Sequence, residues 1–372
     1  MEFTLEKKDN KSKARCGRMQ TYHGEINTPV FMPVGTQGTV KTLSPRELLE
    51  CGVQILLGNT YHLYLRPGDS LIASMGGLHT FMNWAAPILT DSGGYQVFSL
   101  TELRKLDEGG VTFRSHIDGS QHRLTPKSVI DIQYNLGSDI MMVLDECTGY
   151  PCSYETAKRS NKLTTKWAKE AHAYWECKSD TQQHALFAIV QGSVYDKLRI
   201  ESANHLIDLN FPGYAIGGLA VGEPKDLRDQ MTSICTDLLP ESKPRYLMGI
   251  GTPQDILDSI ALGVDMFDCV IPTRNARNGT VYTWSGKIII KSARYTNESG
   301  PIDENCSCYA CRNFSRAYLR HLFNVNEILG LRLATLHNIH FYMLLVREAR
   351  RKILSNSYNT WKKEILNKMN LN

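Results

Sequence analysis

Long apolar segments and low-complexity stretches are both missing from this 372-residue chain. Its longest apolar run near the end, Phe341 to Val346, has six residues, whereas a membrane-spanning helix needs roughly 18. The first fifteen residues mix acids with lysines and contain no apolar signal core. Hydrophobic residues make up 42% and charged residues 22%, which excludes disordered and collagen-like classes. We therefore expect a cytoplasmic protein without membrane contact, built from one large or two medium domains.

A disulfide framework is missing too. Seven of the ten cysteines are scattered without a repeating spacing, which is untypical of a disulfide-stapled chain. The other three, Cys306, Cys308 and Cys311, lie within six residues. Three thiolates with a distant histidine suit a closed tetrahedral Zn2+ site, which would be structural because no ligand position stays open for water. By position, His337 and His340 could each supply the fourth ligand.

Acidic residues are missing from Thr273 to Arg294, a stretch that holds five bases. From Arg347 to Asn372, seven bases stand against two acids. The net charge is only +4, so the distribution of charge says more than its size. Clustered bases of this kind can contact nucleic-acid phosphates, although a solvated helix face explains the C-terminal run equally well.

Eight short runs rich in Val, Ile, Leu and Met are separated by amphipathic stretches, as expected for parallel strands that are buried on both faces. They are Val30–Val34, Val53–Leu57, Pro87–Thr90, Ile140–Leu144, Leu186–Val190, Tyr214–Leu219, Tyr246–Ile250 and Val264–Val270. A hydroxyl cap followed by proline predicts helix starts at Ser44-Pro45, Thr125-Pro126 and Thr252-Pro253. This α/β alternation fits a (β/α)8 TIM barrel or an open doubly wound sheet.

The ends of the predicted strands favour the barrel. Six of them finish, or nearly finish, in polar or glycine residues: Asp91, Asp145, Gln191, Gly217-Gly218, Gly249-Gly251 and Asp268. In a barrel the carboxyl ends of all strands surround one mouth, so these groups would converge, whereas an open sheet would spread them along an edge.

The alternation stops at Thr273. Two short strand-like segments around Ser285-Gly286 predict a β-hairpin, and the cysteine cluster follows. We interpret residues 1–272 as a catalytic barrel with an N-terminal extension. Residues 273–345 would form a basic hairpin and zinc-binding subdomain inserted after the last strand, and 346–372 a basic C-terminal helix that completes the barrel.

Two aspartates are candidates for chemistry. Asp91 is followed by Gly93-Gly94, which lets the backbone approach a ligand closely. Asp268 stands in an apolar strand run, so it must be paired, bound to a ligand or used in catalysis. Asp265 is the alternative to Asp268, and a salt bridge to Arg274 or Arg277 is the purely structural explanation for either.

A second pair of groups suggests a pocket for a heterocyclic base. Asp145 can accept ring N–H groups, while Gln191 can both donate and accept. Gly217-Gly218 offers backbone contacts without bulk. Tyr95 or Met248 could stack on a ring. Each of these residues, taken alone, also has a plain packing explanation.

Together these motifs carry a resemblance over nearly the full length. The chain resembles the queuine tRNA-ribosyltransferases, or tRNA-guanine transglycosylases, and most closely their bacterial form. The matching segments are Asn59–Leu63, Thr90–Gln96, Leu144–Cys147, Ile189–Gly192, Gly217–Glu223, Phe267–Arg274 and the cysteine cluster with a later histidine. Two departures are Tyr95, where the family usually has Phe, and Gly149, where bacterial members usually have Pro.

The resemblance implies an exchange of guanine 34 in the anticodon of certain tRNAs. Asp268 would attack C1′ of the ribose and form a covalent ribosyl-enzyme, and Asp91 would act as general acid or base. The implied base-binding residues are Asp91, Ser92, Gly93, Gly94, Tyr95, Asp145, Gln191 and Gly218. The implied zinc ligands are Cys306, Cys308, Cys311 and His337, which favours His337 over His340.

Two segments match the anticodon-loop contacts of the family. They comprise Gly249, Ile250, Gly251, Thr252, Pro253, Gln254 and Asp255, and then Thr273, Arg274, Asn275, Ala276 and Arg277. Cys147 matches a pocket cysteine of bacterial members, which favours the 7-deazaguanine preQ1 over queuine as the incoming base. The resemblance also implies a homodimer with one structural Zn2+ per chain.

Four alternatives stay open at this stage. The chain could insert queuine instead of preQ1. It could be a non-catalytic tRNA-binding partner subunit, although such chains lose the two carboxylates. A sugar glycosidase shares the carboxylate pair but gives no reason for the basic cysteine-rich segment. A metal-dependent hydrolase is the weakest alternative, because the segment around His62 supplies one histidine only.

Overall fold

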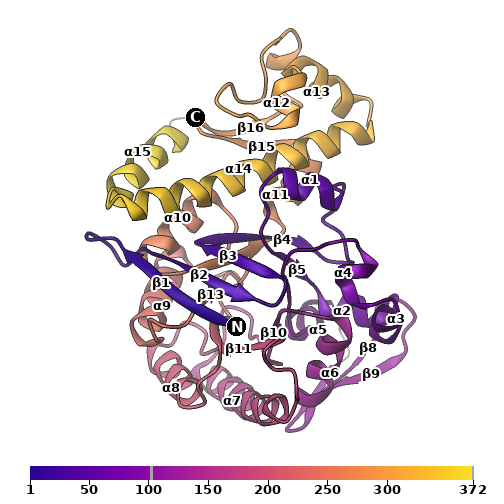
Figure 1. Cartoon of the computed structure of the whole chain (residues 1–372), viewed down its shortest axis with the longest axis vertical. Helices are drawn as coiled ribbons and strands as arrows, with labels where there is room; N and C mark the ends of the chain where they lie inside the picture. Colours follow the sequence, from indigo (N-terminus) through magenta and orange to yellow (C-terminus); the bar gives the residue numbers. More distant parts are fainter. Residues whose placement is uncertain (101–103, 371–372) are drawn as a thin grey trace.

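Eight parallel strands close into a barrel, as the alternating pattern predicts (Figure 1). The computed structural model describes residues 1–100 and 104–370. Around the barrel the strands are β4 (Val30–Gly35), β5 (Leu56–Gly58), β6 (Ile88–Thr90), β10 (Ile140–Met142), β11 (Ala185–Val190), β12 (Gly213–Ile216), β13 (Arg245–Leu247) and β14 (Met266–Cys269). β14 pairs with β4, which closes the ring and excludes the open doubly wound sheet.

Helices follow the strands along the chain. They are α1 (Pro45–Glu50), α2 (Thr60–Leu65), α3 (Asp69–Ser74), α4 (Gly77–Phe81), α5 (Gly94–Leu100), α6 (Pro126–Leu136), α7 (Tyr154–Glu176), α8 (Asp196–Ile207), α9 (Lys225–Leu238), α10 (Pro253–Ala261) and α11 (Ile271–Arg277). The three predicted proline starts are confirmed. Ser44, Thr125 and Thr252 each accept a backbone N–H from the third helical residue, which satisfies a donor that the helix itself leaves unpaired.

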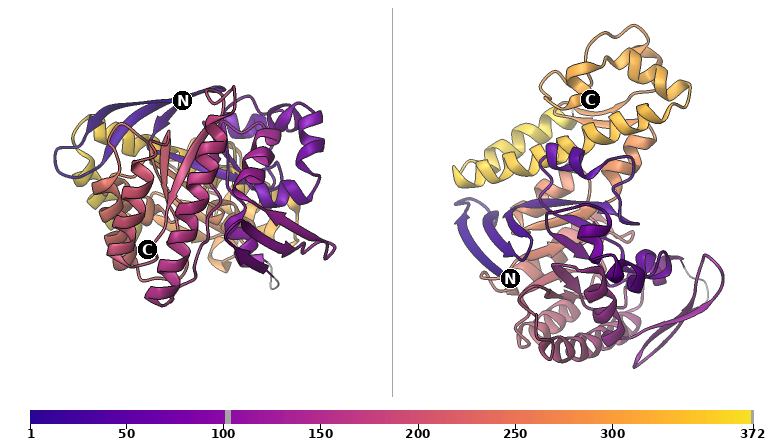
Figure 2. Two further views of the ribbon diagram at one scale, coloured as in Figure 1. Left: turned by 90° about the horizontal axis from the view of Figure 1, so that it is seen from below. Right: turned by 45° about the vertical axis from the view of Figure 1, so that its right-hand side comes forward.

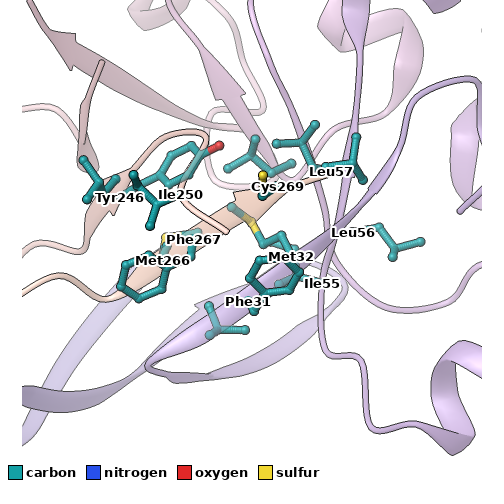
Figure 3. Close-up of a cluster of buried hydrophobic side chains, with 14 of the residues drawn as sticks. Phe31, Met32, Ile55, Leu56, Leu57, Tyr246, Ile250, Met266, Phe267 and Cys269 are labelled. Carbon is teal, nitrogen blue, oxygen red and sulfur yellow. The ribbon is translucent and has the colours of Figure 1, made fainter. Parts of the chain in front are cut away.

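The barrel wall is rigid because its strands are packed on both faces. All six residues of β11 are buried. Figure 3 shows Phe31 and Met32 of β4 close to Met266 and Phe267 of β14, and all four side chains are fully buried. Burial of each such side chain stabilises the fold by ~1.5–3 kcal/mol. This packing fixes the positions of the groups at the strand ends.

Two small antiparallel sheets were not expected from the sequence. One comprises β1 (Glu2–Lys8), β2 (Arg15–Thr21) and β3 (Gly24–Thr28), and the other β7 (Arg104–Asp107), β8 (Gly110–Arg114) and β9 (Gln121–Leu124). The second sheet projects from the barrel in Figure 2. Strands such as β1 are exposed or half-buried throughout, so they carry no continuous apolar run that would mark them.

The segment after β14 forms the predicted hairpin and a helical unit. Its elements are β15 (Thr280–Thr283), β16 (Gly286–Ile289), the 3-10 turn η1 (Ala293–Tyr295), α12 (Tyr309–Asn313), α13 (Arg316–Asn324), α14 (Ile328–Leu354) and α15 (Tyr358–Asn370). α14 contacts α11, β15 and β4, and Figure 1 shows it between the barrel and the helical unit. The boundary expected at 345/346 lies inside α14, and residues 371–372 of the last expected domain lie outside the described residues. Among the described residues, no helix combines the length and apolarity that a membrane span requires.

Candidate active site

A cavity of about 660 Å3 opens at the carboxyl ends of the barrel strands. It brings together residues far apart in the chain, among them Asp91 after β6, Asp145 after β10, Gly218 after β12 and Asp268 in β14. The convergence expected for a barrel is therefore present. Ser92, Gly93, Tyr95 and Cys147 also line this cavity.

Asp91 is held by three donors. The N–H of Thr60 reaches its Oδ1 at 2.8 Å, Gln96 Nε2 donates to Oδ2 at 2.9 Å, and Asn59 Nδ2 donates to the same oxygen. Burial raises the pKa of Asp91 to about 6 in spite of these donors, and the charge of Asp268 adds to the rise. A carboxyl with such a pKa can both give and take a proton near neutral pH.

Asp268 is oriented differently. Tyr246 donates its hydroxyl to Oδ1 at 2.6 Å, and the N–H of Gly249 reaches the same oxygen at 2.8 Å. Among the described residues none donates to Oδ2, so that oxygen is available to attack an electrophilic carbon. Burial raises the pKa of Asp268, and the two donors partly oppose that rise.

The structure separates Asp268 from its alternative, Asp265. Asp265 lies just before β14 and forms a buried salt bridge with Arg15 of β2, with a distance of 2.5 Å between Nη2 and Oδ2. It is therefore a structural ion pair away from the cavity. Within the described residues neither aspartate forms a salt bridge with Arg274 or Arg277.

Asp145 lines the cavity, and Gln191, which is not among the lining residues, lies behind it as the second layer of the same wall. Gln191 Nε2 donates to Asp145 Oδ2 at 2.7 Å, and Ser92 Oγ donates to Oδ1 at 3.0 Å. Burial raises the pKa of Asp145, while these donors oppose the rise. Gly218 has a φ of +63°, and a Cβ there would lie 2.1 Å from Gln191 Oε1. Only glycine therefore fits between this wall and the cavity.

The two segments expected to contact RNA lie around the cavity to different extents. Gly249, Ile250, Gly251, Thr252, Asp255 and Arg274 line it. Pro253, Thr273 and Ala276 are buried in the core, and Gln254 is exposed. Asn275 donates to the hydroxyl of Tyr282 at 2.8 Å, so its side chain supports the hairpin. Arg274 is exposed at the rim and Arg277 is partly buried.

Three features of the site were not singled out from the sequence. Asn59 and Gln96 orient Asp91, and Tyr246 orients Asp268. Glu223 lines the cavity and accepts the N–H groups of Ala220 and Val221. Asn59, Gln96 and Glu223 fall inside motifs quoted above, but amides, carboxylates and hydroxyls are too common in proteins to mark a site without their spatial partners.

Cys306, Cys308, Cys311 and His337 form a buried group that could hold a metal ion. His337 Nδ1 lies 3.7, 3.6 and 3.3 Å from the three sulfur atoms. Ligands of a tetrahedral zinc ion with one nitrogen and three sulfur atoms are separated by about 3.6 Å. Nε2 of His337 donates to Tyr282 O at 2.7 Å, which leaves Nδ1 free to bind metal. His340 is not part of this group.

Comparison with known proteins agrees with this geometry. A family model described as Queuine tRNA-ribosyltransferase matches residues 9–371. A protein named queuine tRNA-ribosyltransferase from Caldanaerobacter subterraneus subsp. tengcongensis is 56% identical over 368 residues, which cover 99% of this chain and 97% of the relative. One of the same name from Thermoanaerobacter pseudethanolicus is 55% identical over 371 residues, with the same coverage. Another from Desulforudis audaxviator is 54% identical over 364 residues, covering 98% of this chain and 97% of the relative.

The family match spans almost the entire chain, and each of these relatives shares more than half of its residues. The chain therefore belongs to the queuine tRNA-ribosyltransferase family of tRNA-guanine transglycosylases.

Proposed function

We propose that the protein exchanges guanine 34 in the anticodon of its tRNA substrates for preQ1 through a covalent ribosyl-aspartate intermediate. The observation that carries this proposal is the pair of carboxylates in one cavity, where burial, together with the charge of Asp268, raises the pKa of Asp91. One carboxylate has an oxygen free for attack, and the other has a pKa suited to proton transfer. The same pairing is found in retaining glycosidases, where one carboxylate is the nucleophile and the other is the general acid and base.

The steps follow from these positions. Oδ2 of Asp268 attacks C1′ of the ribose, the bond from C1′ to N9 breaks, and the departing guanine takes a proton from Asp91. Asp91 then accepts a proton from the incoming base, whose nitrogen attacks C1′ and releases Asp268. The oxocarbenium-like transition state is stabilised by the nearby carboxylate charge. The enzyme returns to its starting protonation state.

Asp145, Gln191 and Gly218 would hold first guanine and then its replacement. The acidic oxygens of Asp145 accept N–H groups of the base, and the small size of Gly218 allows close backbone contact. Ser92 and Gly93 line the same cavity, whereas Gly94 lies against Asp145, since a Cβ on Gly94 would lie 2.5 Å from Asp145 O. Tyr95, half exposed at the cavity, is placed to stack on a base.

The anticodon loop would lie over the cavity mouth. Gly249–Asp255 and Thr273–Arg277 surround it, with Arg274 exposed at the rim. The target base must leave its stack to bring C1′ into a pocket of this depth. Neighbouring bases would be recognised in a splayed single-stranded loop.

The metal in the Cys3His group would be a structural Zn2+. With four protein ligands it leaves no site for water and supplies no step of the reaction. A homodimer is proposed from the family resemblance. Exposed apolar side chains on the metal-containing unit, such as Tyr309 and Ile328, support an interface there.

The proposal is tested with tRNA that carries labelled guanine at position 34. The protein is incubated with it in the presence of preQ1 and, separately, of queuine. We expect release of label with preQ1 and little with queuine, because Cys147 at the pocket favours the smaller base. Release with queuine only would show that the protein inserts queuine instead of preQ1. No release with either base would indicate a non-catalytic tRNA-binding subunit. A tRNA with adenine at position 34 is the matched control.

A further inference from the structure

Arg199 of α8 is a buried cation that the reaction described above does not use. Its side chain is fully buried, and among the described residues no carboxylate lies within salt-bridge distance of it. A buried guanidinium without a counter-charge is costly unless other groups compensate it. Four backbone carbonyl groups do so here.

Those carbonyls lie at the end of β11 and in the loops after β11 and β12, which carry the base-binding residues. Arg199 Nε donates to Ser193 O at 2.8 Å, and Nη1 donates to Val190 O at 3.0 Å. Nη1 also donates to Gly217 O at 2.7 Å, and Nη2 reaches Gly218 O at 3.3 Å. One planar group thus joins the end of β11, which precedes Gln191, to the end of β12, which precedes Gly218.

The loop after β11 needs such support. Gly192 has a φ of +134°, and Ser193 has a φ of +51°, which is unfavourable for a residue with a side chain. A Cβ on Gly192 would lie 2.8 Å from the backbone nitrogen of Arg199. The guanidinium therefore holds a strained loop directly behind the wall formed by Asp145 and Gln191.

The bond to Gly217 O has a further consequence. The Gly217–Gly218 peptide is trans, since it is not among the cis bonds of the described chain. In a trans peptide the C=O and N–H groups point in opposite directions. Because the C=O is directed at Arg199, the N–H of Gly218 faces away from it, and Gly218 lines the cavity.

A cation on the C=O side strengthens the N–H of the same peptide as a donor, since hydrogen bonds in series polarise one another in a low-dielectric interior. When the bond from C1′ to N9 breaks, negative charge develops on the departing base. A preorganised donor aimed at that charge stabilises the transition state more than the ground state.

We propose that Arg199 is a positioning residue for base exchange, which fixes the Gly217–Gly218 peptide and polarises its N–H toward the departing base. This inference rests on the proposed function, because it assumes that the cavity holds a purine during the reaction. It adds Arg199 to the residues that the proposed reaction needs, as one that acts through the Gly217–Gly218 peptide without contact to the base itself.

The test compares Arg199→Met and Arg199→Lys with Arg245→Met. Arg245 is a matched control, since it is also a buried arginine on backbone carbonyls, those of Leu239 and Gly263, but it begins β13 at the opposite end of the barrel. The measurements are single-turnover release of guanine from tRNA, tRNA affinity and the urea midpoint. For Arg199→Met we expect release to slow by about 100-fold while tRNA affinity stays unchanged. Arg245→Met should lower the urea midpoint and leave the release rate of folded enzyme intact.

Arg199→Lys keeps the charge but loses the planar fork that joins the two loops. We expect an intermediate release rate, and this variant serves as the test if Arg199→Met does not fold. Calorimetry with free bases adds a readout that a merely structural role would not move. Wild type should prefer guanine over 2-aminopurine, which lacks the carbonyl oxygen, and the preference should shrink in both Arg199 variants.

Folded Arg199 variants that release guanine at the wild-type rate and keep the same base preference would overturn the inference. So would equal losses of release rate in the Arg199 and Arg245 variants. A wild-type protein that releases no guanine would instead reject the proposed function, so the two failures are distinguishable.

Discussion

The two central carboxylates differ in how their oxygens are occupied. Asp91 accepts hydrogen bonds on both oxygens, while Asp268 accepts both of its bonds on Oδ1. The first arrangement fixes a group that exchanges protons without moving. The second orients a carboxylate and leaves one oxygen for a covalent bond. Their environments, more than their residue type, thus separate the roles of acid–base and nucleophile that we propose for them.

Replacing Asp268 with asparagine removes the nucleophilic oxygen but keeps the shape of the side chain. We expect no covalent complex with tRNA in denaturing gels, while metal content and tRNA binding stay at the wild-type level. Asp265→Asn is the contrasting variant, since it should weaken the fold without touching the cavity. A trapped complex that survives in Asp268→Asn would reject the nucleophile assignment.

The raised pKa of Asp91 predicts how guanine release depends on pH. Release needs Asp91 in its acid form, and with a pKa of about 6 that form is lost as the pH rises above 6. Single-turnover release should therefore fall about tenfold per pH unit at high pH. On the acid side, release should fall as Asp268 is protonated. Asp91→Asn should bind tRNA yet lose turnover, and an unchanged alkaline limb in that variant would refute the role of Asp91.

At the scale of elements, the metal-binding group links the hairpin to α14. Its three cysteines lie on the segment around α12, its histidine lies on α14, and that histidine also bonds to Tyr282 of β15. The hairpin strands and α12 have only four or five residues each, too few to bury a core by themselves. Metal binding would therefore contribute directly to the folding of the unit.

Removing the metal should disorder this unit before the barrel. In Cys308→Ser, or after treatment with a chelator, amides of β15, β16 and α12 should exchange with solvent faster, while those of β11 stay protected. Cys177→Ser is the matched control, because Cys177 is an exposed cysteine that follows α7 directly. Equal protection of the hairpin with and without metal would contradict a structural role.

A second link joins the N-terminal sheet to the barrel. Arg15 donates to Asp265 through Nε and Nη2, and it also reaches the carbonyls of Glu241 and Lys243. Arg15→Met would leave the carboxylate of Asp265 buried without its partner. We expect the free energy of unfolding to fall by ~3–5 kcal/mol, measured by urea denaturation.

The exposed ion pair between Lys8 and Glu241 provides the control. Lys8→Ala removes the same type of interaction from the solvent-exposed side of this sheet. There the solvent screens the two charges, so an ion pair contributes little to the free energy of unfolding. A similar loss of stability in Lys8→Ala and Arg15→Met would show that burial does not explain the effect.

At the scale of the whole molecule, basic charge and the cavity lie next to each other. The acid-free stretch that begins at Thr273 follows β14 directly, so the fold places its first residues at the cavity rim. Of its bases Arg274 lines the cavity, so in the proposed function this arginine would supply positive charge where an RNA backbone passes to bring a base into the cavity. The same bases spread evenly over the surface would not orient the substrate.

Arg274→Ala should weaken tRNA binding and lower the salt dependence of the affinity by about one phosphate contact. Arg277→Ala should have a smaller effect, because its side chain is partly buried. Filter binding at several salt concentrations measures both slopes. Lys169→Ala, on an exposed position of α7, is the control. An unchanged slope for Arg274→Ala and Arg277→Ala would place the RNA surface elsewhere.

The sequence by itself determined the barrel, its eight strands and the metal group. Parallel strands buried on both faces leave continuous apolar runs, and three of the four metal ligands lie within six residues, so both signals are local. The fourth ligand is distant in sequence, and only the family resemblance favoured His337 over His340. The sequence could not reveal β1–β3 or β7–β9, because they carry no such run: β1 is half-exposed throughout, and the mostly buried β2 is interrupted by arginine, glycine and glutamine. Nor could the strand pattern alone choose between Asp265 and Asp268, since alternation does not say what stands opposite each side chain; the family resemblance favoured Asp268.

Only the tertiary structure decided those points. Arg15 is 250 positions from Asp265, and Asn59 is 32 positions from Asp91, so no spacing in the chain announces either contact. The same holds for Arg199, which reads as an ordinary helix residue until the ends of two strands are placed against it. The physical reason is that the pKa, orientation and pairing of a buried group depend on its neighbours in space. Only the tertiary fold brings those neighbours together.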